Sequence, residues 1–362
     1  MKYLILGVIS GVFLAFIPFL QPESGIEIYP EWHGSVESIR RIEPSSNPVL
    51  SKSSVPPVTR GSTVHVLNGS GTHSAEYDSG DKLTAVSGNG RYLVEFEKVG
   101  SSIEFMNLQG ERFWKLASLE YPYLSFEGKL ILLLNGDHSR IRFADINGNI
   151  IGAQSVSGRF CTVISFSKTG NTAAAGFLDG SYCVVDTKGA ITAKGKTPDN
   201  TVVKGIAVSS NGGFCAVHYG NTKSDHVRIV NVVEKDEETF DLHNVHLART
   251  ALYCGNDGNV AVLDKDRLTF TDSDGDVNFF LNVPEAKTGY SKIDYGRGIY
   301  TITYSLSSGG AKFLMLREDG NVLYTKDVIE EPFLDCRIDR GAVFLQGSQS
   351  LMCYSIHFPR NE

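Results

Sequence analysis

Residues 161–195 read CTVISF, SKTG, NTAAAGF, LDG, SYCVVD, TKG and AITAKG. The four longer runs are rich in β-branched, aromatic and small apolar residues, and the short segments between them consist of turn residues. This alternation of apolar runs and turn residues predicts four consecutive antiparallel strands joined by tight turns. An isolated sheet of this size is marginal in water, so the unit is expected to pack against neighbours of the same kind.

Similar units recur along the chain, each marked by a glycine in the turn between its first two strands. The marker glycines are Gly90, Gly128, Gly170, Gly212, Gly258, Gly298 and Gly341, at intervals of 38, 42, 42, 46, 40 and 43 residues. A period near forty residues is typical of a propeller blade. We therefore expect an all-β fold, a seven-bladed β-propeller with four-stranded antiparallel blades, in preference to a pair of β-sandwiches or a β-solenoid.

The last unit supplies only three strands, FLDCRI, AVFLQG and SLMCYSI, before the sequence ends at Glu362. A closed ring must pair the strand edge that this leaves open, because unpaired edges invite aggregation. The expected donor is STVHVL, Ser62–Leu67, which precedes the first unit. The ring is thus predicted to be closed by a strand from the N-terminal side.

The first sixty residues have a different character. Tyr3–Leu20 is an uncharged apolar run of 18 residues, long enough to cross a hydrocarbon core. We interpret residues 1–20 as a signal anchor forming a transmembrane helix, with a cleaved signal peptide as the alternative. Residues 21–60 hold half of the chain's prolines and a serine cluster, which predicts an extended tether, partly ordered at the apolar segment Ile26–Trp32. Residues 61–362 would form the propeller, outside the cytoplasm and most simply at a bacterial inner membrane facing the periplasm.

The segment FSKTGNTAAAGFLDGSYCVVDTKGAI, residues 166–191, is similar to a degenerate WD-repeat blade, with its turn, alanine-rich strand, second Asp-Gly turn and strand ending in aspartate. The chain resembles the broader class of WD-like and quinoprotein-like bacterial propellers. The resemblance covers Asp81 to Ile356, without the Gly-His and Trp-Asp dipeptides of strict WD repeats. It implies a platform for protein assembly more often than catalysis.

The residue inventory argues against several kinds of chemistry. A net charge of −7 offers no basic field for nucleic acid. Metalloprotease, serine hydrolase and nucleotide-binding signatures are missing from the sequence, and two tryptophans are few for a quinone cofactor. The run around Asp272, Asp274 and Asp276 departs from an EF-hand loop and is interpreted as a hairpin turn. We expect no catalytic residues, no cofactor and no metal.

Two groups of residues remain as weaker candidates for sites or cross-links. His243 and His246, with Asp225 and His226, would bring imidazoles to one rim, but two loop histidines do not make a zinc site. The six cysteines show no CxxC pair and lie mostly in apolar runs, which favours buried free thiols over disulfides.

The topology of a propeller places two sets of loops on one face: those joining second to third strands and those joining one blade to the next. Aromatic and arginine side chains there are common energetic anchors of interfaces. The candidate partner-binding residues on this face are Tyr121, Tyr123, His138, Arg140, Arg159, Phe160, His226, His246 and Arg249. The leading hypothesis is a membrane-tethered, non-enzymatic scaffold with a protein partner in an envelope complex. The alternatives are a propeller enzyme of lyase, hydrolase or quinoprotein type, or a small-ligand sensor, using the central channel.

Overall fold

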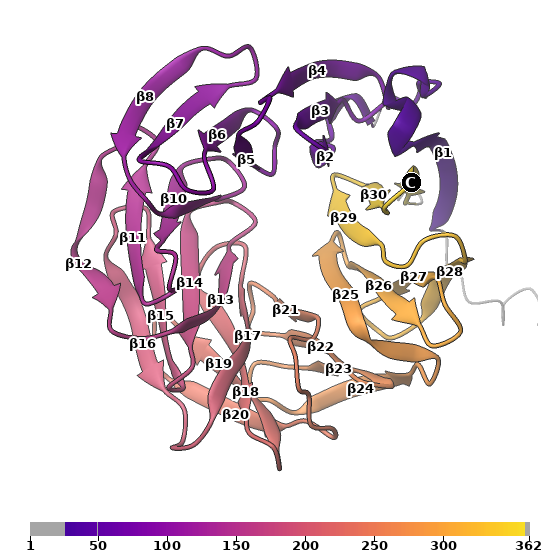
Figure 1. Ribbon diagram of the computed structural model, residues 1–362. Helices are drawn as coiled ribbons and strands as arrows, with labels where there is room; N and C mark the ends of the chain where they lie inside the picture. Colours follow the sequence, from indigo (N-terminus) through magenta and orange to yellow (C-terminus); the bar gives the residue numbers. More distant parts are fainter. Residues whose placement is uncertain (1–25, 49, 359–362) are drawn as a thin grey trace, which may run out of the picture.

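The computed structural model describes residues 26–48 and 50–358, which form a closed ring of β-sheets around a central opening (Figure 1). The described strands group into eight sheets arranged as blades, seven of four strands and one of three. Within each complete blade, neighbouring strands pair antiparallel and the first strand lies nearest the ring centre. The predicted all-β propeller is therefore confirmed, but the predicted blade number of seven is wrong.

The blades are numbered in chain order. Blade 1 contains β2 (Val58–Arg60), β3 (Thr63–Leu67) and β4 (His73–Asp78), and blade 2 contains β5 (Leu83–Val86), β6 (Tyr92–Phe96), β7 (Ser102–Asn107) and β8 (Arg112–Ala117). Blade 3 contains β9 (Tyr121–Leu124), β10 (Leu130–Leu134), β11 (Arg140–Asp145) and β12 (Ile150–Ser157). Blade 4 contains β13 (Cys161–Phe166), β14 (Thr172–Phe177), β15 (Ser181–Asp186) and β16 (Ile191–Lys196). Blade 5 contains β17 (Val202–Val208), β18 (Phe214–Gly220), β19 (Asp225–Asn231) and β20 (Glu237–Asp241), and blade 6 contains β21 (Leu252–Cys254), β22 (Val260–Asp264), β23 (Arg267–Thr271) and β24 (Val277–Asn282). Blade 7 contains β25 (Ala286–Gly296), β26 (Ile299–Leu306), β27 (Ala311–Arg317) and β28 (Val322–Val328). Blade 8 contains β29 (Asp335–Asp339), β30 (Ala342–Gln346), β31 (Ser350–His357) and β1 (Glu27–Ser35). Two short 3-10 helices, η2 (Val36–Arg41) and η3 (Leu50–Lys52), lie between β1 and β2.

The hydrophobic core is distributed over the seams between blades. Each seam holds one cluster of buried apolar side chains, so every blade buries both faces against its neighbours. In the seam between blades 3 and 4, for example, Leu132 and Phe143 pack with Ala175 and Phe177. This division of the core explains why no single blade needs to be stable alone.

The seven marker glycines all occupy the turn between the first and second strands of a blade. Each has a positive φ, such as +72° at Gly170, where a side chain would also meet the backbone nitrogen of Glu127. Only glycine adopts this conformation without strain. Blade 1 contains three strands, and its first hairpin, β2–β3, turns at Gly61 without a preceding inner strand. Because blade 1 has no inner hairpin to carry a marker, counting markers finds seven blades in a ring of eight.

The ring is closed by β1, so the prediction that Ser62–Leu67 closes it is wrong. Thr63–Leu67 is instead β3, the middle strand of blade 1. β1 pairs antiparallel with β31, from Glu27 opposite His357 to Ser35 opposite Ser350, with a bulge between Pro30 and Trp32. β1 is the outermost strand of blade 8, a position where Pro30 removes no ladder hydrogen bond. The prediction of closure by an N-terminal strand is right in principle but names the wrong strand.

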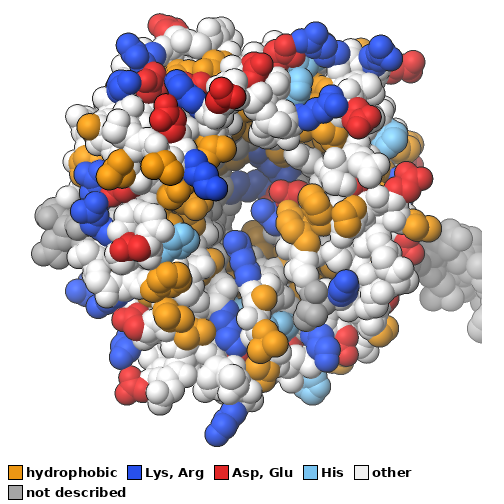
Figure 2. Space-filling view, in the orientation of Figure 1, with side chains coloured by type: hydrophobic (Ala, Val, Ile, Leu, Met, Phe, Trp, Pro, Cys, Tyr) orange, Lys and Arg blue, Asp and Glu red, His pale blue; other side chains and the backbone are white. Residues whose placement is uncertain are grey.

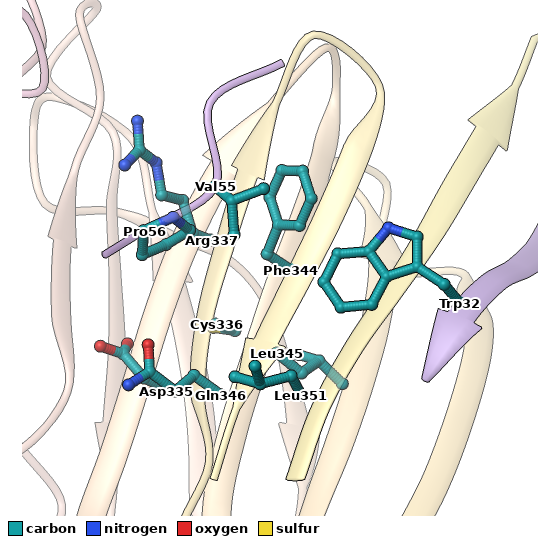
Figure 3. A pocket seen from close by; sticks show the side chains of 10 residues that line it. All are labelled: Trp32, Val55, Pro56, Asp335, Cys336, Arg337, Phe344, Leu345, Gln346 and Leu351. Atoms are coloured by element: carbon teal, nitrogen blue, oxygen red, sulfur yellow. The ribbon is translucent and has the colours of Figure 1, made fainter. Parts of the chain in front are cut away.

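From Glu27 onward, the segment predicted as a tether is part of the ring. After β1, the chain passes through η2 and η3 and fills the seam between blades 8 and 1, where Ile39, Ile42 and Leu50 are buried. Figure 3 shows Trp32 and Phe344 in this seam beside Val55 and Pro56, around a cavity of about 20 Å³. The indole Nε1 of Trp32 donates to the carbonyl of Gly69 at 3.0 Å. The prolines therefore shape a packed connection rather than a solvated linker.

The expectation of a transmembrane helix at residues 1–20 falls on a segment outside the described residues. Within residues 26–48 and 50–358, no helix has the length and apolar character needed to cross a membrane. A seven-bladed propeller preceded by such a helix is thus not the fold described here.

Candidate functional site

The loop face is the side of the ring that carries the turns between second and third strands and the connections between blades. Eight of the nine predicted partner-binding residues belong to these loops or to the strand ends beside them, whereas Tyr123 lies within β9, one residue before the end that leads away from this face. Six of the nine come from blade 3 and from its connection to blade 4, whereas His226, His246 and Arg249 come from blade 5 and its connection to blade 6. The structure therefore divides the predicted set into two groups.

The connection from blade 2 to blade 3 holds Leu119 outward on a rigid loop. Its neighbours Ser118 and Glu120 are buried, and the Ser118 hydroxyl donates to Glu120 Oε2 at 3.0 Å. Arg142 Nε donates to Glu120 Oε1 at 2.9 Å, and Arg140 Nη2 lies 3.4 Å from the same oxygen. Leu119 itself is 78% exposed. The charged groups thus fix the loop, and the apolar side chain at its tip is presented to solvent.

The connection from blade 3 to blade 4 presents Phe160 in a similar way. Its ring, 50% exposed, stacks on the imidazole of His138 with a centroid distance of 5.5 Å and an interplanar angle of 18°. The carbonyl of Phe160 accepts from the backbone N–H of Leu178, which is also an exposed apolar residue, at 2.9 Å. Arg159 Nε lies 3.6 Å from Asp179 Oδ2. We call Leu119, Phe160 and Leu178, with Arg140 and Arg159, the loop-face patch.

The other predicted residues have more local roles. The Tyr121 hydroxyl donates to the carbonyl of Lys98 at 3.1 Å, and Tyr123 lies exposed in β9. The His226 Nδ1 lies 2.6 Å from Asp241 Oδ1, and its ring stacks on Tyr219. Arg249 lines the mouth of the central channel. None of these residues belongs to the loop-face patch. Tyr121 and Tyr123 share blade 3 with Arg140 of that patch.

His246 is a structural residue rather than an exposed anchor. It is buried, its Nε2 lies 2.9 Å from Asp264 Oδ1, and its backbone N–H donates to Asp225 Oδ2 at 2.8 Å. The same carboxylate lies 3.0 Å from Nε2 of the buried His218. Burial opposes ionisation of Asp264, but hydrogen bonds from His246 and the His243 backbone hold the pKa of this carboxyl below its usual range.

Within this network, burial is the main cause that lowers the pKa of His218, and Asp225 opposes the shift. The arrangement therefore combines neutral imidazole with ionised carboxylates at a junction between blades 5 and 6. Of the four residues grouped in the sequence, His246 and Asp225 meet here, and His243 joins them only through its backbone N–H, which donates to Asp264. His218, Asp264 and Lys204 also belong to the network, since Lys204 Nζ donates to Asp225 Oδ1 at 2.5 Å and to the carbonyl of His246 at 2.6 Å.

The central channel contains a cavity of about 610 Å³ lined by the inner strands of blades 4 to 8. Figure 2 shows lysine and arginine side chains gathered around this opening. The charged lining residues are Lys168, Arg249, Lys292, Asp294, Asp335 and Arg337. Lys292 Nζ lies 3.7 Å from Asp335 Oδ1, on the side nearer the loop face.

The opposite end of the channel is crossed by charged side chains. Lys168, in the β13–β14 turn, donates to Asp294 Oδ1 at 3.1 Å and to the carbonyl of Ile338 at 2.7 Å. Arg337 Nη1 donates to the carbonyl of Gly88 at 2.8 Å, and its guanidinium lies 3.9 Å from the ring centre of Phe126. These groups therefore connect blades on different sides of the ring.

The acidic segment considered as a calcium loop is a hairpin turn, and possible metal ligands converge elsewhere. The Asp272–Asp276 segment is the turn between β23 and β24, in which Asp272 Oδ1 accepts from the backbone N–H groups of Asp274 and Asp276 at 3.0 Å each. The hairpin interpretation is thus confirmed. Among the described residues, a different group of possible ligands converges: His65, His73 and Glu76 on blade 1.

All six cysteines are buried and free in the described part of the chain. Burial raises the pKa of Cys161 to about 11 and those of Cys183 and Cys254 to about 12. Thiols with raised pKa in apolar seams are poor nucleophiles. The expectation of buried free thiols is confirmed.

Sequence reasoning missed Leu119, Leu178 and the channel-crossing pair Lys168 and Asp294. Leu119 and Leu178 could have been found as single apolar residues inside polar connections, ASLEY and FLDGS. The pairing of Lys168 with Asp294 joins residues 126 positions apart, and no local pattern signals it.

The fold has solved counterparts. The crystal structure of BamB from Moraxella catarrhalis matches with a TM-score of 0.59 and 11% identity, covering 93% of this chain and 99% of that one. A Dos1 propeller structure matches with a TM-score of 0.57 and 11% identity, covering 91% and 95%. No protein-family model and no curated sequence matches the chain. At this identity, the likeness establishes the propeller fold alone.

Proposed function

We propose that this protein is a non-enzymatic interaction scaffold that binds a protein partner through the loop-face patch. The observation that carries the proposal is the loop of Leu119, whose apolar side chain is exposed while the residues on both sides are buried and hydrogen-bonded. An apolar group held outward by a rigid frame costs little conformational entropy on binding. Phe160 and Leu178 add two further exposed apolar side chains on the same face, and Arg140 and Arg159 supply polar groups beside them.

The central channel supports a scaffold better than an enzyme or a sensor. Lys168 and Asp294 pair with each other, and Arg337 donates to the carbonyl of Gly88 on blade 2, so these three groups connect blades rather than converging on an open reaction centre. A general acid, base or nucleophile must be able to reach a substrate atom. Lys168 is held by Asp294 and by the carbonyls of Tyr295 and Ile338, and Arg337 by the carbonyl of Gly88.

The same proposal places the ring in the cell envelope, outside the cytoplasm. The support is the apolar run Tyr3–Leu20, which has the character of an export segment and lies outside the described residues. Fractionation of cells carrying the full chain, with an antibody to a C-terminal tag, should recover the protein with the envelope. Recovery with the cytosol alone would contradict this part of the proposal.

The scaffold is tested by placing a photo-crosslinking amino acid at position 119 or 160 of the full chain in its native cells. We expect a discrete adduct of higher mass from both positions. The matched control is position 280 on β24, because Phe280 is also 50% exposed and carries a stacked cation, Arg267. No adduct is expected there.

A second arm uses the double variant Leu119→Ser, Phe160→Ser. It should lose the partner captured by the wild-type chain while keeping the wild-type thermal midpoint. Capture that survives the double variant, or adducts that form equally at position 280, would overturn the proposal.

A further inference from the structure

Two histidines and a glutamate on blade 1 bring three potential metal-ligand atoms to one point. His65 Nδ1 lies 3.5 Å from His73 Nε2, and each of these nitrogens lies 3.5 Å from Glu76 Oε2. The imidazoles are sheltered, with side-chain exposures of 13% for His65 and 21% for His73. The cluster lies well apart in sequence and topology from the loop-face patch.

The backbone explains how the three side chains reach one face. His65 of β3 and Glu76 of β4 are direct cross-strand partners. His73 would alternate to the opposite face, but a register shift between Val66 and Leu67 interrupts the alternation near Ser74. A β-bulge of this kind redirects a side chain. The other face of the hairpin, with Val64 and Tyr77, packs against blade 2.

The spacing suits ligands of a small cation better than it suits mutual hydrogen bonds. Zinc binds histidine nitrogen and carboxylate oxygen at about 2.0–2.2 Å in a tetrahedron, which separates neighbouring ligand atoms by about 3.4 Å. The observed separations of 3.5 Å fall close to that value. As hydrogen bonds they would be long and weak.

The chemistry of the donors points in the same direction. Burial lowers the pKa of His65, while Glu76 opposes the shift and His73 and Arg40 reinforce it. A neutral imidazole is the form that binds a metal. Two imidazoles and one carboxylate are the ligand set of zinc sites that keep a fourth position open.

The surroundings provide the opening. His65 and Glu76 line a groove of about 970 Å³ between η2 and blade 1, together with Arg40, Arg41 and Arg60. The fourth position can thus be reached by water or by an anion from solvent. Arg40 forms an ion pair with Glu76, but its side chain is largely exposed and can leave.

We propose that His65, His73 and Glu76 form a zinc site whose fourth position opens into this groove. The site goes beyond the scaffold proposed above and does not depend on it. Arg40 competes with the cation for the Glu76 carboxylate, because a guanidinium and a metal ion require the same oxygens.

The test is a titration of the chelator-treated full chain with Zn²⁺ by calorimetry, and with Co²⁺ as a spectroscopic probe. We expect one equivalent to bind, with the intense visible bands of four-coordinate Co²⁺. His65→Ala and His73→Ala should each weaken binding by at least about tenfold. Arg40→Ala should strengthen it several-fold, an effect that a general loss of folding would not produce.

The matched control is His226→Ala, which removes a histidine that is 25% exposed and already has a carboxylate partner, Asp241. Its affinity for zinc should equal that of the wild type. Circular dichroism of each variant checks that the ring is intact. Absence of stoichiometric binding, a six-coordinate Co²⁺ spectrum, or equal loss in His226→Ala and His65→Ala would overturn the proposal.

Discussion

Lys168 and Asp294 form an ion pair across the centre of the ring, with 3.1 Å between Nζ and Oδ1, although they belong to blades 4 and 7. The same ammonium donates to the carbonyl of Ile338 on blade 8. Asp294 also accepts from the backbone N–H of Ile338 at 2.9 Å. One lysine of blade 4 therefore reaches blades 7 and 8, and it narrows the channel at the end away from the loop face.

Replacing this lysine should destabilise the ring measurably. Lys168→Met leaves a partly buried carboxylate and two backbone carbonyls without their cationic donor, for a loss of about 1–3 kcal/mol. The thermal midpoint should fall accordingly. Lys129→Met is the control, since the exposed pair of Lys129 with Glu127 is expected to contribute less than about 1 kcal/mol. Equal effects of the two variants would refute the structural role of Lys168.

The two histidines His246 and His226 should behave differently when truncated. His246→Ala removes the buried partner of Asp264, and we expect it to lower the free energy of unfolding by about 1–3 kcal/mol. His226→Ala breaks a pair with the exposed Asp241 and should cost less than about 1 kcal/mol. Thermal unfolding of both variants provides the comparison. A smaller effect for His246 would show that the buried network does not stabilise the junction.

The ionised carboxylate of Glu331 should stabilise blade 8, and this contribution should be lost in acid. Its buried carboxylate accepts from the backbone N–H and hydroxyl of Ser348 and of Ser350, and from the backbone N–H of Gln349. Burial opposes the charge, but these hydrogen bonds outweigh it and hold the pKa of Glu331 below its ordinary value of 4.5. The stabilisation is therefore complete above about pH 4.5 and disappears as the pH falls through the lower folded-state pKa.

The variant Glu331→Gln should accordingly be less stable than the wild type by about 1–3 kcal/mol at neutral pH. The difference should stay constant from pH 6 to 8 and shrink below about pH 4.5. Urea unfolding across this pH range measures it. A difference that grows on acidification would have the wrong sign for a depressed carboxyl pKa.

Truncating Trp32 should weaken ring closure specifically. Trp32→Ala removes a buried indole from the seam of blades 8 and 1, at a cost of about 3–5 kcal/mol. Hydrogen exchange should rise most in β1 and β31. The control Trp114→Ala removes an indole stacked on Phe105 in the seam of blades 2 and 3, where exchange should rise instead. The same exchange pattern in both variants would contradict the assignment of Trp32 to closure.

Most of the ring could be predicted because its information is local. Gly170 and the other markers sit in turns that demand positive φ, and apolar runs such as CTVISF and SYCVVD become strands as expected, β13 at the inner edge of blade 4 and β15 in its interior. The sequence did not predict blade 1, because that blade lacks an inner strand and its marker glycine. It did not predict β1 as a strand of the ring, because Pro30 and its neighbours have the composition of a linker. An outer strand tolerates proline, so composition alone misjudged it.

The candidate site could be predicted only in part. Topology placed Phe160 and His138 on the loop face, and the structure shows that they lie there and stack. It could not distinguish them from His246, since the partners that bury His246 lie on other strands, at Asp225 and Asp264. The cluster of His65, His73 and Glu76 depends on a bulge, which shifts side chains between faces without any strong signature in sequence.

The pairing of β1 with β31 also sets a timetable for folding. Glu31 and Ser355 hydrogen-bond although they lie 324 residues apart in the chain, so β1 cannot pair until β31 has been synthesised. During that interval, β1 has an unsatisfied edge, and the blades between can assemble only into an open arc. Closure is thus the final, slowest and most aggregation-exposed step expected of this topology. A chaperone that shields β1 during synthesis would act on the yield of the protein without changing its final stability.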